Sequence, residues 1–437
     1  MRSNLFAGTA LALIVLLCTP VASATALHKG PTLGAGGCDN PETIRVTRLD
    51  DDGPGTLRHA IHSPNWEPDE LESRSCRHIE FDVGGVIELS EPIRIRSDYV
   101  TIDGCSAPEP GITLTHRHEV PAGQGTGLLI EGNRAFTHDI ILRCLRFEGI
   151  HDDDPVQKVG AGLLAVDADC IQVPEPFRCK GGWSQANDDG GVANLWFHRV
   201  SFGNVRDKFM LWGKIRDVAV TDSFFYRNPL AFLISYYAGP ADLQRRDILA
   251  YRNVFAENNE RNPQLRGWID GLEIRSNVIY AWDSFPPLVA NGAVVGDGYG
   301  IRIKNETGEK PVNANIVGNV FLPGTSAADR ALIYGIKPGM DMQDLGSSRC
   351  LPQGEDYSLS ELGDLWVRDN DLPAANCEHY STTDAPIAVA DWMSAMTEGP
   401  DDLCAGLSAG IGAPYRTTLE ESILSRVRQR YGCTAND

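Results

Sequence analysis

A short strand pattern recurs six times between residues 140 and 321, and it constrains the fold more than any other feature of the chain. Each copy has alternating apolar residues, a bend and the start of a second strand, which is typical of a coil rather than a hairpin. The copies begin at Ile140, Leu195, Val218, Ile248, Leu272 and Ala314. One copy is too short and too polar to bury a face alone, so it needs other copies stacked on it. The pattern therefore predicts a solenoid.

The bend of this pattern carries a recurring polar residue. Asn253, Asn277 and Asn319 occupy one position of their copies, and Ser223 occupies it in a fourth copy. An inward-facing Asn at a bend can hydrogen-bond to the Asn of the next coil, although a single Asn also marks ordinary turns. Recurrence at one register favours a ladder. We therefore expect an all-β fold, a right-handed parallel β-helix with short capping helices and a C-terminal helical tail.

The beginning of the chain is typical of an export signal. Arg2 precedes an apolar run at residues 11–17, and the small residues Ala24 and Ala26 suit signal-peptidase cleavage. This run is too short to span a bilayer, and no later segment is long and apolar enough for a membrane helix. We expect residues 1–26 to be a signal peptide and the mature protein to be secreted or periplasmic.

The remaining residues, 27–437, are expected to form a single domain and a monomer, because a solenoid grows in one direction without needing a new core. A Gly/Pro turn followed by a short amphipathic segment predicts a helix at about 55–62. Such a helix would cover the open edge of the first coil. A C-terminal extension is expected from about 345 to 437.

The formal net charge of −20 argues against nucleic acid as a partner, since a polyphosphate would be repelled. A polyanionic substrate therefore needs a locally basic site. The loop between the copies that begin at Ile248 and Leu272 reads R-N-P-Q-L-R, from Arg261 to Arg266, and it is the candidate for such a site.

Ten of the eleven cysteines remain after Cys18 is removed with the signal, and an even number in an exported protein suggests disulfides. Cys105 and Cys144 fall near strand positions, where buried free thiols are the alternative. No C-x-x-C pair exists, so a zinc site is not expected. Proximity in sequence favours the pairs Cys170–Cys179, Cys350–Cys377 and Cys404–Cys433.

Several segments together resemble one family. They are G-P-G-T-L-R-H-A-I, I-E-F-D-V-G-G-V-I-E-L, V-T-I-D-G-C-S-A-P, N-L-W-F-H-R-V-S-F, R-N-P-Q-L-R and A-G-I-G-A-P-Y-R-T-T-L, which run from near residue 53 to near residue 419. Their combination is similar to the exported bacterial pectate lyases of polysaccharide lyase family 1, and it covers most of the mature chain. The resemblance implies a β-helix and β-elimination across a uronosyl linkage.

The resemblance also implies roles for the arginine loop. In the family, a base removes the C5 proton, the C4 oxygen leaves, and calcium and cationic side chains neutralise the adjacent carboxylate. The family's R-x-P-x-x-R signature falls on Arg261, Pro263 and Arg266, with Arg261 as the base and Arg266 binding the substrate carboxylate. Two surface arginines in a turn are the alternative interpretation.

The family's calcium ligands are matched only in part. The resemblance aligns Asp207 with one ligand, and it aligns Asp188 and Asp189 loosely with carboxylates further upstream. Calcium prefers several oxygen ligands, so three carboxylates and waters would suffice. Phe197 and Leu211 stand where the family has carboxylates. A polar loop without metal is the alternative for Asp188 and Asp189.

The family's substrate-binding Lys falls on Leu230, although Arg227 lies close enough in sequence to substitute for it. Arg206 and Lys208 flank Asp207 and could supply positive charge where calcium would bind. These departures suit either a less anionic substrate, as in the family's pectin lyases, or a site that has lost catalysis.

Two other functions are carried as alternatives. Polygalacturonases share the β-helix and have paired aspartates and an R-I-K segment, which Asp188–Asp189 and Arg302–Lys304 resemble, but their other motifs are absent. The second alternative is a non-catalytic β-helix that binds acidic glycan or serves as an envelope scaffold. In each case the partner is a polysaccharide that contains uronic acids, and the sequence does not name it.

Overall fold

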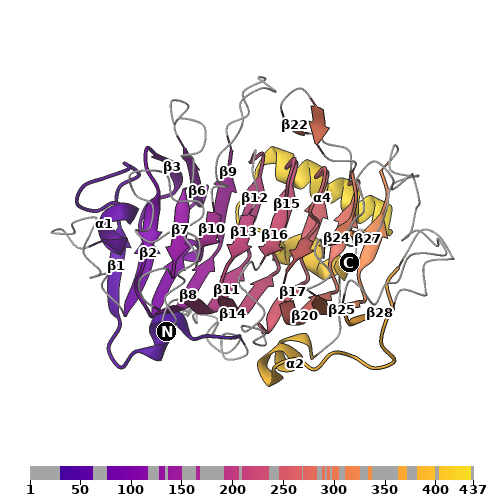
Figure 1. The fold of residues 1–437 in the computed structure, drawn as a ribbon. Coiled ribbons are helices and arrows are strands. Elements are labelled where there is room, and N and C mark those ends of the chain that lie inside the picture. The colour runs from indigo at the N-terminus through magenta and orange to yellow at the C-terminus, as the bar shows by residue number, and fades with distance from the viewer. Residues whose placement is uncertain are drawn as a thin grey trace, which may run out of the picture.

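The repeated strand pattern forms the coils of a parallel β-helix in the computed structural model of the protein (Figure 1). Among the described residues, the strands form three parallel sheets of ten, eight and eight strands and one two-stranded antiparallel sheet. The predicted fold class is confirmed. The structure describes residues 30–62, 76–116, 127–132, 136–149, 164–167, 191–205, 209–235, 246–267, 269–282, 288–290, 293–295, 298–304, 311–324, 333–336, 363–371, 381–398 and 403–434.

Successive strands pass from sheet A to sheet B to sheet C in each coil. Sheet A contains β1 (Glu42–Val46), β2 (Arg77–Phe81), β5 (Val100–Asp103), β8 (Phe136–Arg143), β11 (Gly191–His198), β14 (Ile215–Thr221), β17 (Ile248–Tyr251), β20 (Ile269–Arg275), β25 (Val312–Val317) and β28 (Leu365–Arg368). Sheet B contains β3 (Gly85–Leu89), β6 (Ile112–His116), β9 (Leu145–Glu148), β12 (Ser201–Gly203), β15 (Phe224–Tyr226), β18 (Val254–Ala256), β21 (Val278–Tyr280) and β26 (Val320–Leu322). Sheet C contains β4 (Ile93–Ile95), β7 (Leu128–Glu131), β10 (Leu164–Asp167), β13 (Phe209–Trp212), β16 (Phe232–Ser235), β19 (Gln264–Arg266), β24 (Ile301–Lys304) and β27 (Ile333–Ile336). The antiparallel pair is β22 (Leu288–Ala290) with β23 (Ala293–Val295).

The six copies of the sequence pattern stack in register. Their first residues pair from strand to strand along sheet A, and their last residues pair along sheet B. The aromatic rings of Phe225 and Phe255 stack with centroids 4.8 Å apart inside the solenoid. The apolar positions of all six copies are therefore buried in one continuous core.

The predicted Asn ladder is present at the bend between sheets A and B. Asn253 Nδ2 donates to Asn277 Oδ1 at 3.0 Å, and Asn277 Nδ2 donates to Asn319 Oδ1 at 2.9 Å. Ser223 continues the ladder on one side, and Asn370 continues it on the other. Because Asn370 lies two residues after the end of β28, the stack of coils reaches into the segment that the sequence assigned to a C-terminal extension.

Helices cover three parts of the solenoid. α1 (Leu57–Ile61) is capped by the Thr56 side chain and buries apolar residues in the core beside the first strands, where the sequence predicts a covering helix. α2 (Asp391–Thr397) contacts the outer face of sheet A through Met393. α4 (Thr418–Tyr431) packs its apolar residues on the outer face of sheet B. The remaining elements are α3 (Leu403–Ala405) and the short helices η2 (Gly34–Gly37), η3 (Gly104–Ser106) and η7 (Gly406–Gly410).

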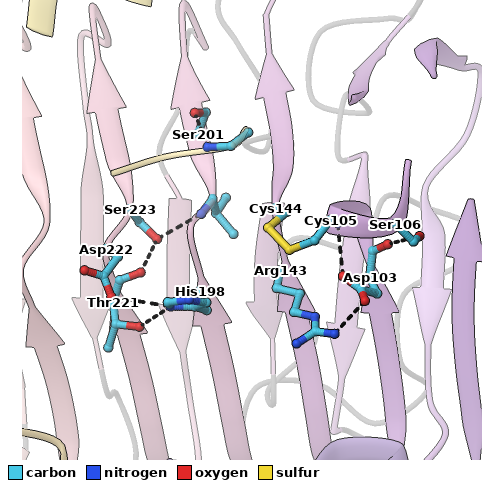
Figure 2. Close-up of a disulfide and its surroundings, with 12 residues drawn as sticks. Asp103, Cys105, Ser106, Arg143, Cys144, His198, Ser201, Thr221, Asp222 and Ser223 are labelled. Carbon is cyan, nitrogen blue, oxygen red and sulfur yellow. Dashed lines mark hydrogen bonds and ion pairs between the residues drawn. A yellow bond between two sulfur atoms is a disulfide. The ribbon is translucent and has the colours of Figure 1, made fainter. Parts of the chain in front are cut away.

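Three disulfides join described cysteines. Cys404–Cys433 confirms one predicted pair, while Cys38–Cys76 was not predicted. The alternative of buried free thiols at Cys105 and Cys144 is wrong, because the bends of adjacent coils bring the two cysteines into a disulfide (Figure 2). Stacking puts the bends of adjacent coils side by side, so two cysteines 39 residues apart in sequence become neighbours. The other predicted pairs, Cys170–Cys179 and Cys350–Cys377, lie outside the described residues.

No helix among the described residues is long and apolar enough to cross a membrane. The predicted signal peptide, residues 1–26, lies outside the described part of the chain.

Candidate functional site

The outer face of sheet C differs from those of the other two sheets. Described helices pack on the outer faces of sheets A and B, through α2 and α4 respectively. No described helix packs on sheet C, where the side chains that point away from the core include several charged ones. The predicted arginine loop enters this sheet, because β19 begins directly after Pro263. The outer face of sheet C is therefore the candidate binding face (Figure 1).

A second Asn ladder anchors the start of the arginine loop. Asn228 Nδ2 donates to Asn258 Oδ1 at 3.0 Å, and Asn258 Nδ2 donates to Asn262 Oδ1 at 3.0 Å. Asn262 Nδ2 then donates to the carbonyl of Tyr299 at 3.1 Å. All three asparagines are buried. The residue between Glu260 and this anchor is Arg261, whose backbone is therefore fixed on both sides.

Arg261 lies beside a buried carboxylate. Its backbone is in the left-handed region, with a φ of 64°, and its side chain is 20% exposed. Arg261 Nε lies 3.7 Å from Glu260 Oε1, and the Glu260 side chain is 2% exposed. The Arg261 guanidinium thus lies beside the Glu260 carboxylate, while part of the Arg261 side chain remains exposed to solvent. This is a suitable position for a group that contacts a substrate.

Glu260 is also held from its other side. The Tyr299 hydroxyl donates to Glu260 Oε2, and Arg302 Nη1 lies 3.6 Å from the same oxygen. Arg302 Nη1 donates to the Tyr299 hydroxyl at 2.6 Å. Burial first, and then the Glu260 charge, raise the pKa of Tyr299 well above its ordinary value, so the phenol keeps its proton and acts as a donor.

Arg266 lies at the end of β19 on the outer side of sheet C. Its neighbour Leu265 is fully buried in the core, and successive residues of a strand point to opposite faces. Arg266 pairs in register with Ser235 on β16 and with Lys304 on β24. Arg261 and Arg302 of β24 both lie beside Glu260. Arg261 is therefore also on the outer side of sheet C. The structure therefore brings the two signature arginines to one face.

Arg227 lies further away along the coil. It follows the sheet B strand β15, and the backbone N–H of Arg227 donates to the carbonyl of Ala256. Leu230, three residues later, forms a bridge with Glu260 at the entrance to sheet C. The position of Leu230 is thus directly beside Glu260 and Arg261, and Arg227 lies at the sheet B end of the same turn.

The missing carboxylates have a structural explanation. Leu211 and Phe197 both point into the core, at 1% exposure each, so neither position faces a ligand on the surface. The outward neighbours of Leu211 on β13 are Met210 and Trp212. Among the described residues, no group of three or more His, Cys, Asp or Glu side chains is arranged to hold a metal ion. The predicted residues Asp188, Asp189, Arg206, Asp207 and Lys208 lie outside the described residues.

Glu260 and Tyr299 are not predicted from the sequence, and the motifs assign Arg302 only to the polygalacturonase alternative. Arg302 is buried with Glu260 and Tyr299, so it supports the arginine loop rather than standing alone. The signal that could have found this group is the register between β19 and β24, which pairs Gln264 with Arg302. That register depends on the residue at which β24 begins, and no sequence motif predicts the start of this strand.

The comparisons with known proteins agree with this fold. The chain is 27% identical over 298 residues to a protein of Aspergillus flavus named probable pectate lyase C, covering 67% of this chain and 53% of that protein. It is 27% identical over 331 residues to a protein of the same name from Aspergillus terreus, covering 75% of this chain and 61% of that protein. This chain resembles the pectate lyases. The resemblance seen in the motifs is thereby confirmed, while no protein-family model matches the chain.

A solved structure gives the same fold. The crystal structure of Jun a 1, the major allergen from cedar pollen, superposes with a TM-score of 0.51 at 16% identity, covering 87% of this chain and 90% of that chain. At this identity the likeness concerns the fold alone. The chain spans a little over half the length of the Aspergillus flavus protein named probable pectate lyase C.

Proposed function

We propose that this protein is a secreted polysaccharide lyase that cleaves a pectate-like or pectin-like uronic-acid polymer by β-elimination. The observation that carries the proposal is the placement of Arg261 and Arg266 on the outer face of sheet C. The sequence resemblance to proteins named pectate lyases supports the reaction type. Export rests on the signal-like residues 1–26.

The two arginines divide the chemistry between them. The C5 proton of a uronate becomes acidic only when the charge of the adjacent carboxylate is neutralised. Arg266 is suited to this task, because its planar guanidinium can donate two parallel hydrogen bonds to a carboxylate. Arg261 accepts the C5 proton only in its neutral guanidine form, so this role requires that it releases a proton to solvent in the complex before the step. The electrons of the broken C5–H bond then form the new C4–C5 double bond, and the C4 oxygen leaves with its electron pair and takes a proton from water.

Glu260 positions Arg261 for this step. The carboxylate is buried, and Tyr299 and Arg302 fix it, so it does not need to reach the substrate itself. The Glu260 carboxylate lies 3.7 Å from Arg261 Nε, so its charge attracts the guanidinium to this side without a direct hydrogen bond at Nε. Substitution of Glu260 by Gln should therefore disturb the orientation of Arg261 more than it disturbs the fold.

Dependence of the activity on calcium is a separate part of the proposal. It rests on Asp188, Asp189 and Asp207, whose oxygen ligands suit calcium. The inward direction of Leu211 removes one ligand of the family's set, so neutralisation of the substrate carboxylate is assigned to Arg266. Loss of activity in a chelator, restored by added calcium, would support the metal. Full activity in the chelator would leave carboxylate neutralisation to the arginines.

The experiment that tests the proposal uses polygalacturonate and methyl-esterified pectin as separate substrates. A lyase releases an unsaturated uronate that absorbs in the ultraviolet, and a hydrolase releases reducing ends without that absorbance. Leu211 and Leu230 are buried where the family has a carboxylate and a substrate-binding Lys. Their presence favours a third outcome, in which the protein binds the polymer and forms neither product. That outcome would replace the lyase by a glycan-binding β-helix.

A further inference from the structure

A second group of basic side chains lies on the outer face of sheet A, on a different sheet from the arginine loop. Arg143 ends β8 and His198 ends β11, and the two residues pair in register on these neighbouring strands. Their side chains are 21% and 30% exposed. Figure 2 shows the two side chains between those of Asp103 and Asp222. Because neighbouring parallel strands lie about 4.8 Å apart, one small group of a ligand can reach both residues.

This pair is a partly exposed row between two covered parts of the surface. Two residues earlier on the same strands, Ile141 and Trp196 are buried, and α2 packs against them. On the other side, the segment that precedes α4 donates a backbone hydrogen bond to the carbonyl of Asp222. Arg143 and His198 are therefore framed by segments from distant parts of the chain, while their own side chains still reach solvent.

The hydrogen bonds of His198 leave one ring nitrogen for a ligand. Trp196 Nε1, which can only donate, donates to Thr221 Oγ1 at 3.0 Å, so the Thr221 hydroxyl has its own hydrogen for His198 Nδ1, also 3.0 Å away. Asp222 Oδ2 lies 3.5 Å from the same nitrogen. Burial, and then the charges of three arginines, lower the pKa of His198 to about 3, so the ring is neutral. Nε2 therefore carries the ring hydrogen, and among the described residues it has no hydrogen-bond partner.

The charges around this imidazole sum to one positive charge. Arg143, Arg199 and Arg252 are the cations that lower the pKa of the ring. Arg143 pairs with Asp103 at 2.5 Å. Arg252 pairs with Asp222 at 2.6 Å. Three cations and two carboxylates leave a surplus of one positive charge, on a protein whose formal net charge is −20. This surplus suits a ligand group with a single negative charge.

Arg143 supplies a second donor for such a group. Its Nη2 donates to Asp103 Oδ2 at 2.5 Å, and within the described part of the chain neither Nε nor Nη1 has a hydrogen-bond partner. One guanidinium can therefore hold the Asp103 carboxylate with one nitrogen and a ligand with another. A carboxylate that accepts from Arg143 Nη1 with one oxygen and from His198 Nε2 with the other would use both donors.

We propose that Arg143 and His198 form a second, non-catalytic binding site, which holds one carboxylate of the uronic-acid polymer on sheet A. Arg199 and Arg252 supply positive potential beside it. Each free uronic-acid unit carries one negative charge, which matches the surplus, whereas a phosphate group carries about 1.5 to 2. A methyl-esterified unit carries no charge and does not bind. This inference rests on the proposed function for the identity of the ligand.

The test is the binding of trigalacturonate to the Arg266→Met variant of the full mature protein by isothermal titration calorimetry. The variant removes the carboxylate-binding arginine of sheet C, so that binding at sheet A is measured. The titration is run at about pH 7.5, where the Asp222 carboxyl, whose pKa burial raises to about 6, is ionised. Adding His198→Phe, which keeps a ring but lacks Nε2, should weaken binding about tenfold, and adding Arg143→Met should do the same.

His138→Phe in the same Arg266→Met background is the matched control. His138 is 24% exposed and also lies on sheet A, but it is beside the carboxylates of Asp98 and Asp139 instead of beside arginines. It should bind within about twofold of the background, which is the change expected for a group outside the site. Thermal unfolding of each variant separates a loss of binding from a loss of folding, and His198→Phe tests the site if Arg143→Met does not fold.

The outcomes separate this inference from the lyase assignment. If His198→Phe binds trigalacturonate as well as His138→Phe does, or if the Arg266→Met background does not bind it, the sheet A site is wrong. Tighter binding of inorganic phosphate or of fully methyl-esterified trigalacturonate would also overturn it.

The lyase assignment is measured independently on the same variants. In the wild-type background, His198→Phe should leave kcat unchanged, because the sheet A site takes no part in the reaction. If binding depends on His198 but the wild type forms no unsaturated product from any polymer, the site stands and the lyase assignment fails. If the wild type forms the product and Arg266→Met binds no trigalacturonate, the lyase assignment stands and the site fails.

Discussion

Replacing Asn277 by Leu removes the central rung of the Asn ladder between sheets A and B. The Asn277 side chain accepts hydrogen bonds from Asn253 N and Asn253 Nδ2, at 2.9 and 3.0 Å. It donates to Ala250 O and to Asn319 Oδ1, both at 2.9 Å. Leucine has the same number of side-chain heavy atoms in the same branched arrangement, and its methyl groups are bulkier than the amide atoms, but it can form none of these four hydrogen bonds. The substitution therefore acts through unpaired polar groups rather than through a cavity.

The size of the effect follows from the groups left unpaired. Asn319 Oδ1 still accepts from the backbone N–H of residue 277, so it remains paired. The buried groups that lose a hydrogen bond are the Asn253 N–H, one hydrogen of the Asn253 amide and the Ala250 carbonyl. At roughly 1–2 kcal/mol each, their desolvation should lower the free energy of unfolding by about 3–6 kcal/mol.

Urea unfolding monitored by circular dichroism measures this loss, and Asn370→Leu provides the comparison. Asn370 accepts from Asn319 and donates to Ile316 O, but it is partly exposed, so water can replace its hydrogen bonds. We expect a loss of about 1–2 kcal/mol for this variant. Equal losses below about 1 kcal/mol at both positions would refute the claim that the buried ladder stabilises the coils.

Three further predictions concern the site, the pH dependence and the C-terminal helix. Arg261→Lys should lower kcat by about a hundredfold or more and change the Kd for trigalacturonate little, because Lys keeps the charge but loses the geometry of the proton acceptor; steady-state kinetics and calorimetry measure the two effects. Burial and then the nearby Arg58 charge lower the pKa of His62 from 6.5 to about 4, so the unfolded chain binds this proton first and stability should fall by about 3 kcal/mol as the pH drops from 6.5 to 4. His62→Gln should flatten that part of the stability curve, and an unchanged slope in this variant would contradict the assignment to His62. Replacing Cys404 and Cys433 by Ser should lower stability by about 3–4 kcal/mol through the loss of a cross-link over a 29-residue separation, and a thermal midpoint equal to that of the wild type would reject this contribution.

The sequence predicts the coils well because the register repeats. Every copy has its apolar residues at the same positions, so one alignment of the pattern places Asn253, Asn277 and Asn319 in one ladder before any coordinates are known. The second ladder was missed, because Asn228, Asn258 and Asn262 do not share a fixed spacing. Asn262 occupies the next rung only four residues after Asn258.

The candidate site was predictable only where it follows a local motif. Arg261 and Arg266 belong to one short segment, and the structure places both at sheet C. Glu260 lay beside them in sequence, but its burial and its bond to Tyr299 depend on a coil that begins some forty residues later. The disulfide Cys105–Cys144 has the same origin, since only the stacking of coils brings the two cysteines together (Figure 2).

The most direct test of the central claim is the ultraviolet absorbance of unsaturated uronate produced from polygalacturonate and from methyl-esterified pectin. The purified mature protein and its Arg261→Lys variant should be measured side by side, at equal concentration and with the same fold by circular dichroism. We expect absorbance to grow with time for the wild type on at least one polymer and to stay near the blank for Arg261→Lys. Equal rates for the two proteins, or no absorbance from the wild type on either polymer, would contradict β-elimination at Arg261.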